Sequence, residues 1–193
     1  MFVYEKKLQY PIRIKNTNPK LAAAIISQYG GPDGELGASL RYLSQRYSMP
    51  YPELKGLLTD IGTEELGHLE MVGTIVHQLT RNLTEQQIKD AGFEAYFVDH
   101  TTGVFPQFAS GYPWSAATMQ VTGDTIADLT EDLAAEQKAR VTYDNILRLS
   151  DDPDVTDAIR FLRAREIVHF QRFGEGLRLV KDRLGEKNVY YMN

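Results

Sequence analysis

The sequence predicts an all-α fold, a bundle of four long helices in which one long crossover joins two helical hairpins. Apolar residues recur at spacings of three and four over several long segments, which is typical of amphipathic helices. Prolines and glycines gather between these segments, and few strand patterns compete with them. The chain has 193 residues, of which 42% are hydrophobic, so it can bury one sizeable core. We expect a single domain over residues 1–193, made of an N-terminal segment (1–33), the bundle (about 34–184) and a C-terminal tail (185–193).

The helical spacing covers five segments that contain no interior proline, namely residues 20–28, 35–47, 53–79, 124–149 and 154–184. Asn18 and Pro19 are typical of a helix cap followed by a first turn, and Asp152 with Pro153 repeats this pattern before the last segment. The glycine-rich run from Gly30 to Gly34 breaks the chain between the first two segments. The last four segments are long enough to form the bundle.

A long connection runs from Arg81 to Gly123, between the third and fourth segments. Thr84 and Gln87 have the spacing of a capping box, which predicts one short helix. Residues 101–114 contain two glycines, two prolines and several aromatic residues, a composition typical of an ordered loop. Four long helices with one long crossover have the connectivity of a ferritin-like bundle rather than of an up-down-up-down bundle.

Composition excludes several classes of partner and site. The formal net charge of −5 favours neither nucleic acid nor an anionic membrane surface. No apolar run is long enough to span a membrane, and the first residues do not resemble an export signal, so we expect cytoplasmic synthesis without a signal peptide. The absence of cysteine excludes disulfides, iron–sulfur clusters and thiolate zinc sites. Histidines and carboxylates are therefore the only strong metal ligands available.

Two Glu-x-x-His pairs interrupt apolar stripes. Glu65 and His68 occupy positions between Ile61 and Val72 where the helical spacing demands core residues, and Glu166 with His169 does the same in the last segment. A spacing of three places both side chains of a pair on one helix face, where they can converge on one metal ion.

The two halves of the chain match at an offset of 101 residues. Glu35 precedes Glu65 by 30 residues, and Glu136 precedes Glu166 by the same 30. Three further positions match at this offset, Ala38 with Ala139, Tyr42 with Tyr143 and His68 with His169. The repeat predicts two hairpins related by a pseudo-two-fold axis.

Four carboxylates in one core need compensating charge, because an unpaired buried carboxylate costs several kcal/mol. Two divalent ions would supply that charge. With oxygen and imidazole donors only, manganese and iron are the candidates, and zinc and magnesium suit such a site less well. The candidate ligands are the carboxylates of Glu35, Glu65, Glu136 and Glu166 and the imidazoles of His68 and His169.

Structural alternatives compete with this hypothesis. A single core histidine such as His68 is more often a hydrogen-bonded structural residue than a ligand, and only the repeated pair favours ligation. Arginines at positions 140, 163 and 165 could instead pair with some of the acids. Each of Tyr42 and Tyr143 is either a hydrogen-bond donor to the site or an ordinary core tyrosine. We expect the acids off the stripes, Glu64, Glu70 and Glu131, on solvated faces, and we expect no metal role for His77 or His100.

Four stretches of the sequence resemble the manganese catalase family: GGPDGELGASLRYLSQRY, EELGHLEMVG, DLAAEQKAR and REIVHF. The resemblance covers nearly the whole chain and is greatest to the short branch known as spore-coat protein JC of endospore-forming bacteria. It implies that Glu35 and His68 bind one manganese, that Glu136 and His169 bind the other, and that Glu65 bridges them. Glu166 would then assist proton movement without binding a metal. Some family members carry an arginine before the third-helix glutamate, where this chain has Ala135.

By this resemblance, the predicted activity is disproportionation of hydrogen peroxide to oxygen and water by two manganese ions, without haem. The resemblance also implies a homo-oligomer, a hexamer, and a place in the spore coat beside other coat proteins. Two alternatives remain open. A di-iron oxidase or ferroxidase would bind iron directly through Glu166. A structural coat protein would use its metal site only to hold the bundle together.

Overall fold

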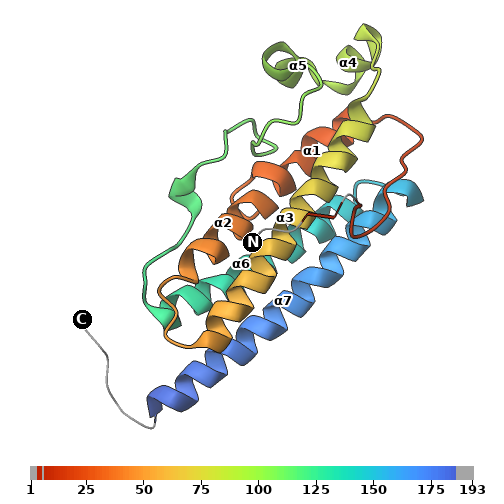
Figure 1. The fold of residues 1–193 in the computed structure, drawn as a ribbon. Coiled ribbons are helices and arrows are strands. Elements are labelled where there is room, and N and C mark those ends of the chain that lie inside the picture. Colours follow the sequence, from red (N-terminus) through yellow and green to blue (C-terminus); the bar gives the residue numbers. More distant parts are fainter. Residues whose placement is uncertain (1–3, 6, 186–193) are drawn as a thin grey trace.

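Two helical hairpins pack side by side in the computed structural model, which describes residues 4–5 and 7–185 (Figure 1). One hairpin is formed by α1 and α2 against α3, and the other by α6 against α7. The helices are α1 (Pro19–Gly30), α2 (Glu35–Gln45), α3 (Pro52–Thr80), α4 (Glu85–Ala91), α5 (Glu94–His100), α6 (Thr125–Leu147) and α7 (Pro153–Gly185), with a 3-10 turn at Ala116–Thr118. All five helices predicted from the spacing are present, so the predicted all-α bundle is confirmed.

The first arm of the bundle, the part of the first hairpin that packs along α3, consists of two consecutive helices, α1 and α2. Figure 1 shows α1 and α2 following one another along α3. Asn18 caps α1 through its side chain, which accepts a hydrogen bond from the backbone N–H of Leu21 at 2.9 Å. The arm breaks after Gly30, where a Cβ atom would lie 2.3 Å from the backbone of Pro106 in the crossover. Because α2 begins at Glu35, the break places this carboxylate in a first helical turn halfway along the bundle.

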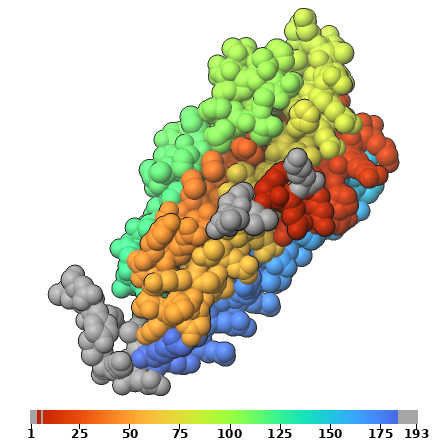
Figure 2. Space-filling view, viewed as in Figure 1, coloured from red at the N-terminus to blue at the C-terminus, as the bar shows by residue number. Residues whose placement is uncertain are grey.

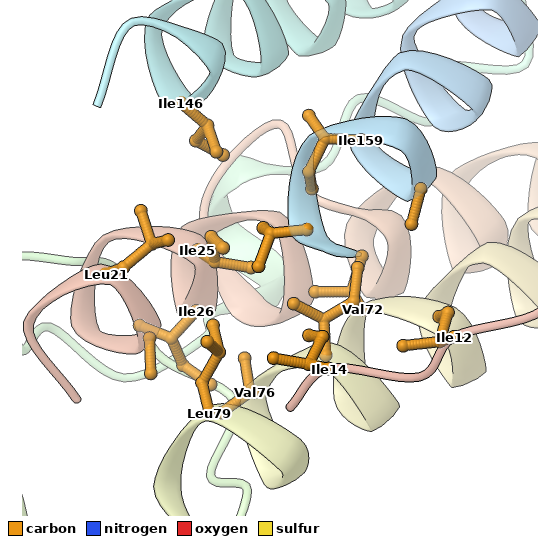
Figure 3. Packing of buried hydrophobic residues seen from close by; sticks show 14 of the residues in the cluster. Ile12, Ile14, Leu21, Ile25, Ile26, Val72, Val76, Leu79, Ile146 and Ile159 are labelled. Atoms are coloured by element: carbon orange, nitrogen blue, oxygen red, sulfur yellow. The ribbon is translucent and has the colours of Figure 1, made fainter. Parts of the chain in front are cut away.

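The N-terminal segment belongs to the bundle more closely than the sequence suggested. Ile12, Ile14 and residues of α1 lie in the same apolar cluster as α3 and α7, as Figure 3 shows. The backbone N–H of Ile14 donates to Gln78 Oε1 at 2.7 Å, which ties the segment to α3. In Figure 2 this segment covers part of the surface over α3 and α7. The N-terminal segment therefore contributes side chains to the core of the bundle.

Two apolar clusters fill opposite ends of the bundle. One contains Met71 and Val72 of α3 with Ile159 and Leu162 of α7. The other contains Leu58 and Ile61 of α3 with Leu129 of α6 and Phe173 and Val180 of α7. Along α3 and α7 the two Glu-x-x-His pairs lie between these clusters. The bundle thus holds a polar layer in its middle, closed above and below by hydrophobic side chains.

The crossover contains more helix than predicted. The predicted capping box of Thr84 and Gln87 is present and begins α4, which ends at Gly92 in the left-handed conformation. The sequence did not predict α5, which is held by Tyr96, whose hydroxyl donates to the carbonyl of Gly103 at 2.5 Å. Residues 101–114 form a loop without a helix, as expected, and the 3-10 turn at Ala116–Thr118 follows before α6. Within the part of the chain that the structure describes, no helix is both long and apolar enough to cross a membrane. Most of the predicted tail, residues 186–193, lies outside the described residues.

Candidate metal centre

Six ionisable side chains from four helices meet in the polar layer. Each is at most 2% exposed. They are Glu35 from α2, Glu65 and His68 from α3, Glu136 from α6, and Glu166 and His169 from α7. The structure therefore brings together all six residues that the sequence singled out, although they span 135 residues of chain.

Glu65 lies between the two histidines. Its Oε2 atom is 2.7 Å from His68 Nδ1, and its Oε1 atom is 2.7 Å from His169 Nδ1. The imidazole ring centroids are 5.5 Å apart. One carboxylate thus faces one nitrogen from each hairpin, which is the arrangement that a ligand bridging two ions requires.

A second carboxylate accompanies each of these nitrogens. Glu35 Oε2 is 3.9 Å from His68 Nδ1, and Glu136 Oε2 is 3.5 Å from His169 Nδ1. Each half of the layer therefore contains one imidazole nitrogen, one oxygen of its own glutamate and one oxygen of Glu65. These are two equivalent sets of donor atoms, as the internal repeat predicted.

Two tyrosines hold the outer carboxylates across the repeat. Tyr42 of α2 donates to Glu136 Oε1 at 2.5 Å, and Tyr143 of α6 donates in the same way to Glu35 Oε1. Burial, and after it the neighbouring carboxylates, raise the pKa of both tyrosines, so both hydroxyls stay protonated as donors. Each tyrosine donates to the glutamate of the opposite hairpin, which links the two halves at Glu35 and Glu136.

Glu166 differs from Glu65, its counterpart in the repeat. Each has one oxygen without a hydrogen-bond partner among the described residues, and the two carboxyl groups differ in their pKa. Burial, followed by the charges of Glu136, Glu35 and Glu65, raises the pKa of Glu166 well above the usual range. One oxygen of Glu166 also lies within 4.8 Å of ligand atoms of Glu65, His68 and His169, close enough to reach the centre.

The two imidazoles carry the positive charge of the layer. Burial lowers the pKa of His68, but Glu65, Glu64 and Glu35 outweigh it and raise this pKa to about 10. Burial also lowers the pKa of His169, and there the carboxylates raise it to about 12. In return, the two imidazoles hold the pKa of Glu65 below its usual range despite burial. The carboxylates of this layer therefore need positive charge nearby. In the protein without a bound metal, the protonated histidines supply it.

The donor set fits a pair of divalent ions. Five buried atoms of the layer have no hydrogen-bond partner among the described residues, namely Glu65 Oε1, His68 Nε2, Glu136 Oε2, Glu166 Oε1 and His169 Nδ1. Buried polar atoms are rarely left in this state unless a water or an ion completes them. Three carboxylates and two imidazoles with such free atoms match the ligand preferences of manganese and iron.

The prediction that Glu64 lies on a solvated face is wrong. Its side chain is 13% exposed and accepts hydrogen bonds from Arg165 at 2.7 Å and from His169 Nε2 at 3.1 Å. The helical spacing misled because Glu64 faces α7, whose Arg165 and His169 contact its carboxylate. The other two arginines that could have paired with the acids, Arg140 and Arg163, bind Asp144 instead.

Sequence reasoning also missed a polar cluster one helical turn from Glu136. Asp132 is fully buried, and both its carboxylate oxygens lack a hydrogen-bond partner. Burial raises the pKa of Asp132 well above the usual range, against the opposing effects of Gln45 and Arg41. Its position at i−4 from Glu136 could have pointed to it, because that spacing places both acids on one helix face.

A family model described as manganese-containing catalase matches residues 1–189 of the chain. The chain belongs to this family. Protein CotJC of Bacillus subtilis is 52% identical over 190 residues, which are 98% of this chain and all of that one. KatB, a manganese catalase from Anabaena, superposes with a TM-score of 0.87 at 32% identity, covering all of this chain and 85% of that chain.

A more distant structure shows how far the manganese catalase fold is shared. A dodecameric thioferritin from Bacteroides fragilis has a TM-score of 0.57 and 14% identity, covering 89% of this chain and 90% of that chain. At this identity the likeness concerns the fold alone. The predicted ferritin-like architecture and the predicted family are both confirmed.

Proposed function

We propose that the chain is a dimanganese catalase that converts two molecules of hydrogen peroxide to oxygen and two of water. The observation that carries this proposal is the position of Glu65, with one oxygen 2.7 Å from the Nδ1 atom of each histidine. In this proposal Glu35 and His68 bind one ion, Glu136 and His169 bind the other, and Glu65 binds both. Membership of the manganese catalase family supports manganese as the metal.

Two manganese ions, when bound, would supply the reservoir for two electrons that the reaction needs. One peroxide loses two electrons and two protons to become oxygen, and the other gains two electrons and two protons to become two waters. Protons must therefore be accepted and returned in each cycle. Glu166 suits this role because its raised pKa and free oxygen allow it to hold a proton beside the centre.

The apolar clusters and the tyrosines also contribute to this function. Leu58, Ile61 and Phe173 close one end of the layer and Val72 and Leu162 the other, so bulk water is excluded from the ligands. The hydrogen bonds from Tyr42 and Tyr143 occupy one oxygen of each outer glutamate. The remaining oxygen of each is then directed at the centre, which fixes the ligand geometry in advance.

The deciding experiment measures oxygen release from peroxide by protein purified from manganese-supplemented cells, with bound manganese and iron quantified on the same sample. We expect activity to scale with manganese content. A double variant, His68→Gln with His169→Gln, is the control and should bind little metal and release little oxygen. A preparation with two manganese ions per chain and no oxygen release would contradict the proposal.

One observation favours a second candidate, a di-iron oxidase or ferroxidase. Glu166 reaches within 4.8 Å of ligand atoms of Glu65, His68 and His169, so it could bind a metal directly. Iron in the purified protein, together with loss of metal in Glu166→Gln, would move this candidate to first place.

Assembly and location belong to the same proposal. By resemblance to the manganese catalases the chain forms a homo-oligomer, a hexamer, and its similarity to Protein CotJC supports a location in the spore coat with other coat proteins. Exposed apolar side chains such as Leu40, Val121 and Phe170 are available for such contacts. A structural coat role would leave the metal bound and peroxide untouched, which the oxygen measurement distinguishes.

A further inference from the structure

The outer nitrogens of both histidines point toward one carboxylate. His169 Nε2 is hydrogen-bonded to Glu64 Oε2 at 3.1 Å, and His68 Nε2 lies 3.6 Å from Glu64 Oε1. The latter nitrogen is buried and has no hydrogen-bond partner. A movement of a few tenths of an ångström would turn its contact with Glu64 into a hydrogen bond. Glu64 and Glu65, neighbours in sequence, therefore face opposite nitrogens of the same two rings.

Arg165 holds Glu64 in this orientation. The Nε atom of Arg165 donates to Glu64 Oε1 at 2.7 Å, and its terminal nitrogen donates to Oε2 at 3.2 Å. This two-point contact fixes the plane of the carboxylate. Arg165 is also the residue that the 101-residue offset pairs with Glu64. Glu64 and Arg165 therefore occupy equivalent positions in the two halves of the chain and form an ion pair with each other.

An acceptor at Nε2 decides which nitrogen of a neutral imidazole carries the proton. The proton stays at Nε2, and the lone pair at Nδ1 is left facing Glu65 and the centre. We propose that Glu64 is a positioning residue shared by both histidines, each carboxylate oxygen serving one ring, so that it couples the two metal positions. This inference rests on the proposed metal centre and does not depend on peroxide turnover.

The variant Glu64→Gln tests the inference with little change of shape. An amide has a single oxygen, so it can accept from one Nε2–H, and its NH2 group faces the other. We expect manganese affinity, measured by competition with a chelator, to fall about 10- to 100-fold for at least one of the two ions. At metal concentrations that saturate the unaltered protein, electron paramagnetic resonance should then show isolated Mn(II) in place of the coupled pair.

Glu70→Gln is the matched control, because Glu70 lies on the same helix and accepts from Tyr4 at 2.6 Å without touching either histidine. It should bind both ions as the unaltered protein does. Glu64→Ala, which removes both acceptors, should weaken both ions. Thermal unfolding of the metal-free variants shows whether they fold, and a folded Glu64→Gln or Glu64→Ala protein with unchanged affinity and spectrum would overturn the inference.

The outcomes separate this inference from the proposed function. Two bound manganese ions without oxygen release would contradict the catalase proposal alone, and the effect of Glu64→Gln on affinity would still support its positioning role. A chain that binds neither manganese nor iron would overturn both.

Discussion

The two hairpins place the same residues around the centre and use them differently. Tyr42 and Tyr143 make equivalent crossed hydrogen bonds to the outer glutamates. Glu65 and Glu166 occupy equivalent positions, yet Glu65 lies 2.7 Å from a nitrogen of each imidazole, whereas the charges that raise the pKa of Glu166 are those of three other glutamates. The pKa of Glu65 is accordingly lowered and that of Glu166 raised. A repeated sequence therefore gives a symmetric set of candidate metal ligands and an asymmetric pair of acids.

The scaffold of the two hairpins differs in the same way. The arm that carries Tyr143 is one continuous helix, α6, whereas the arm that carries Tyr42 is broken between α1 and α2. The break allows the crossover to approach the bundle at Gly30. The pseudo-two-fold symmetry therefore holds for the tyrosine bonds to the outer glutamates. It is lost at the break between α1 and α2, where the crossover packs against Gly30. The following predictions test that difference.

The largest effect is expected from Glu166→Gln. The amide keeps the volume of the side chain but cannot exchange a proton, so peroxide turnover per manganese should fall about 100- to 10,000-fold while metal content is retained. Glu175→Gln, at an exposed position on the same helix, is the control and should have normal activity. Normal turnover by a manganese-replete Glu166→Gln protein would remove Glu166 from the mechanism.

Metal affinity should rise with pH. The pKa of His68 is raised to about 10 and that of His169 to about 12, so both rings are protonated at neutral pH in the protein alone. An ion must displace the proton from each ring that it binds, so raising the pH removes a competitor. We expect about a tenfold gain in affinity per pH unit for each ion between pH 6 and 8. Chelator competition at three pH values measures this, and an affinity that falls as pH rises would contradict it.

The two tyrosines should behave alike, because their hydrogen bonds are equivalent. Tyr42→Phe and Tyr143→Phe each remove a bond to a carboxylate and should lower the free energy of unfolding by about 1.5–3 kcal/mol. Chemical denaturation of the metal-free protein measures the loss, with the exposed Tyr112→Phe as the control. Clearly unequal losses would show that the pseudo-symmetry does not extend to the energetics.

The smallest effect is expected at the break in the first arm. In Gly30→Ala the new methyl group would meet the backbone of Pro106 at 2.3 Å, so the crossover must move, at a cost of about 1–3 kcal/mol. Gly56→Ala is the control, since a Cβ atom at Gly56 would meet nothing within 4 Å. An unfolding midpoint unchanged by Gly30→Ala would show that the contact is not maintained in solution.

The sequence by itself determined the helices and the membership of the centre. Helix spacing is a local property, and the six buried residues could be found because charged groups interrupt apolar stripes and the interruption repeats at an offset of 101. The cost of burying several carboxylates then pointed to cations before any distance was known. These inferences need only helix geometry and the chemistry of each side chain.

Tertiary structure decided which atoms meet. No local pattern shows that each tyrosine bonds to the glutamate of the opposite hairpin, that Arg165 binds Glu64, or that α1 and α2 form one arm. Glu65 and Glu166 each lie three residues before a histidine on an apolar stripe. Only the packing of four helices places Glu65 within 2.7 Å of a nitrogen of both imidazoles. The difference arises because pKa values and hydrogen bonds depend on groups brought together from distant parts of the chain.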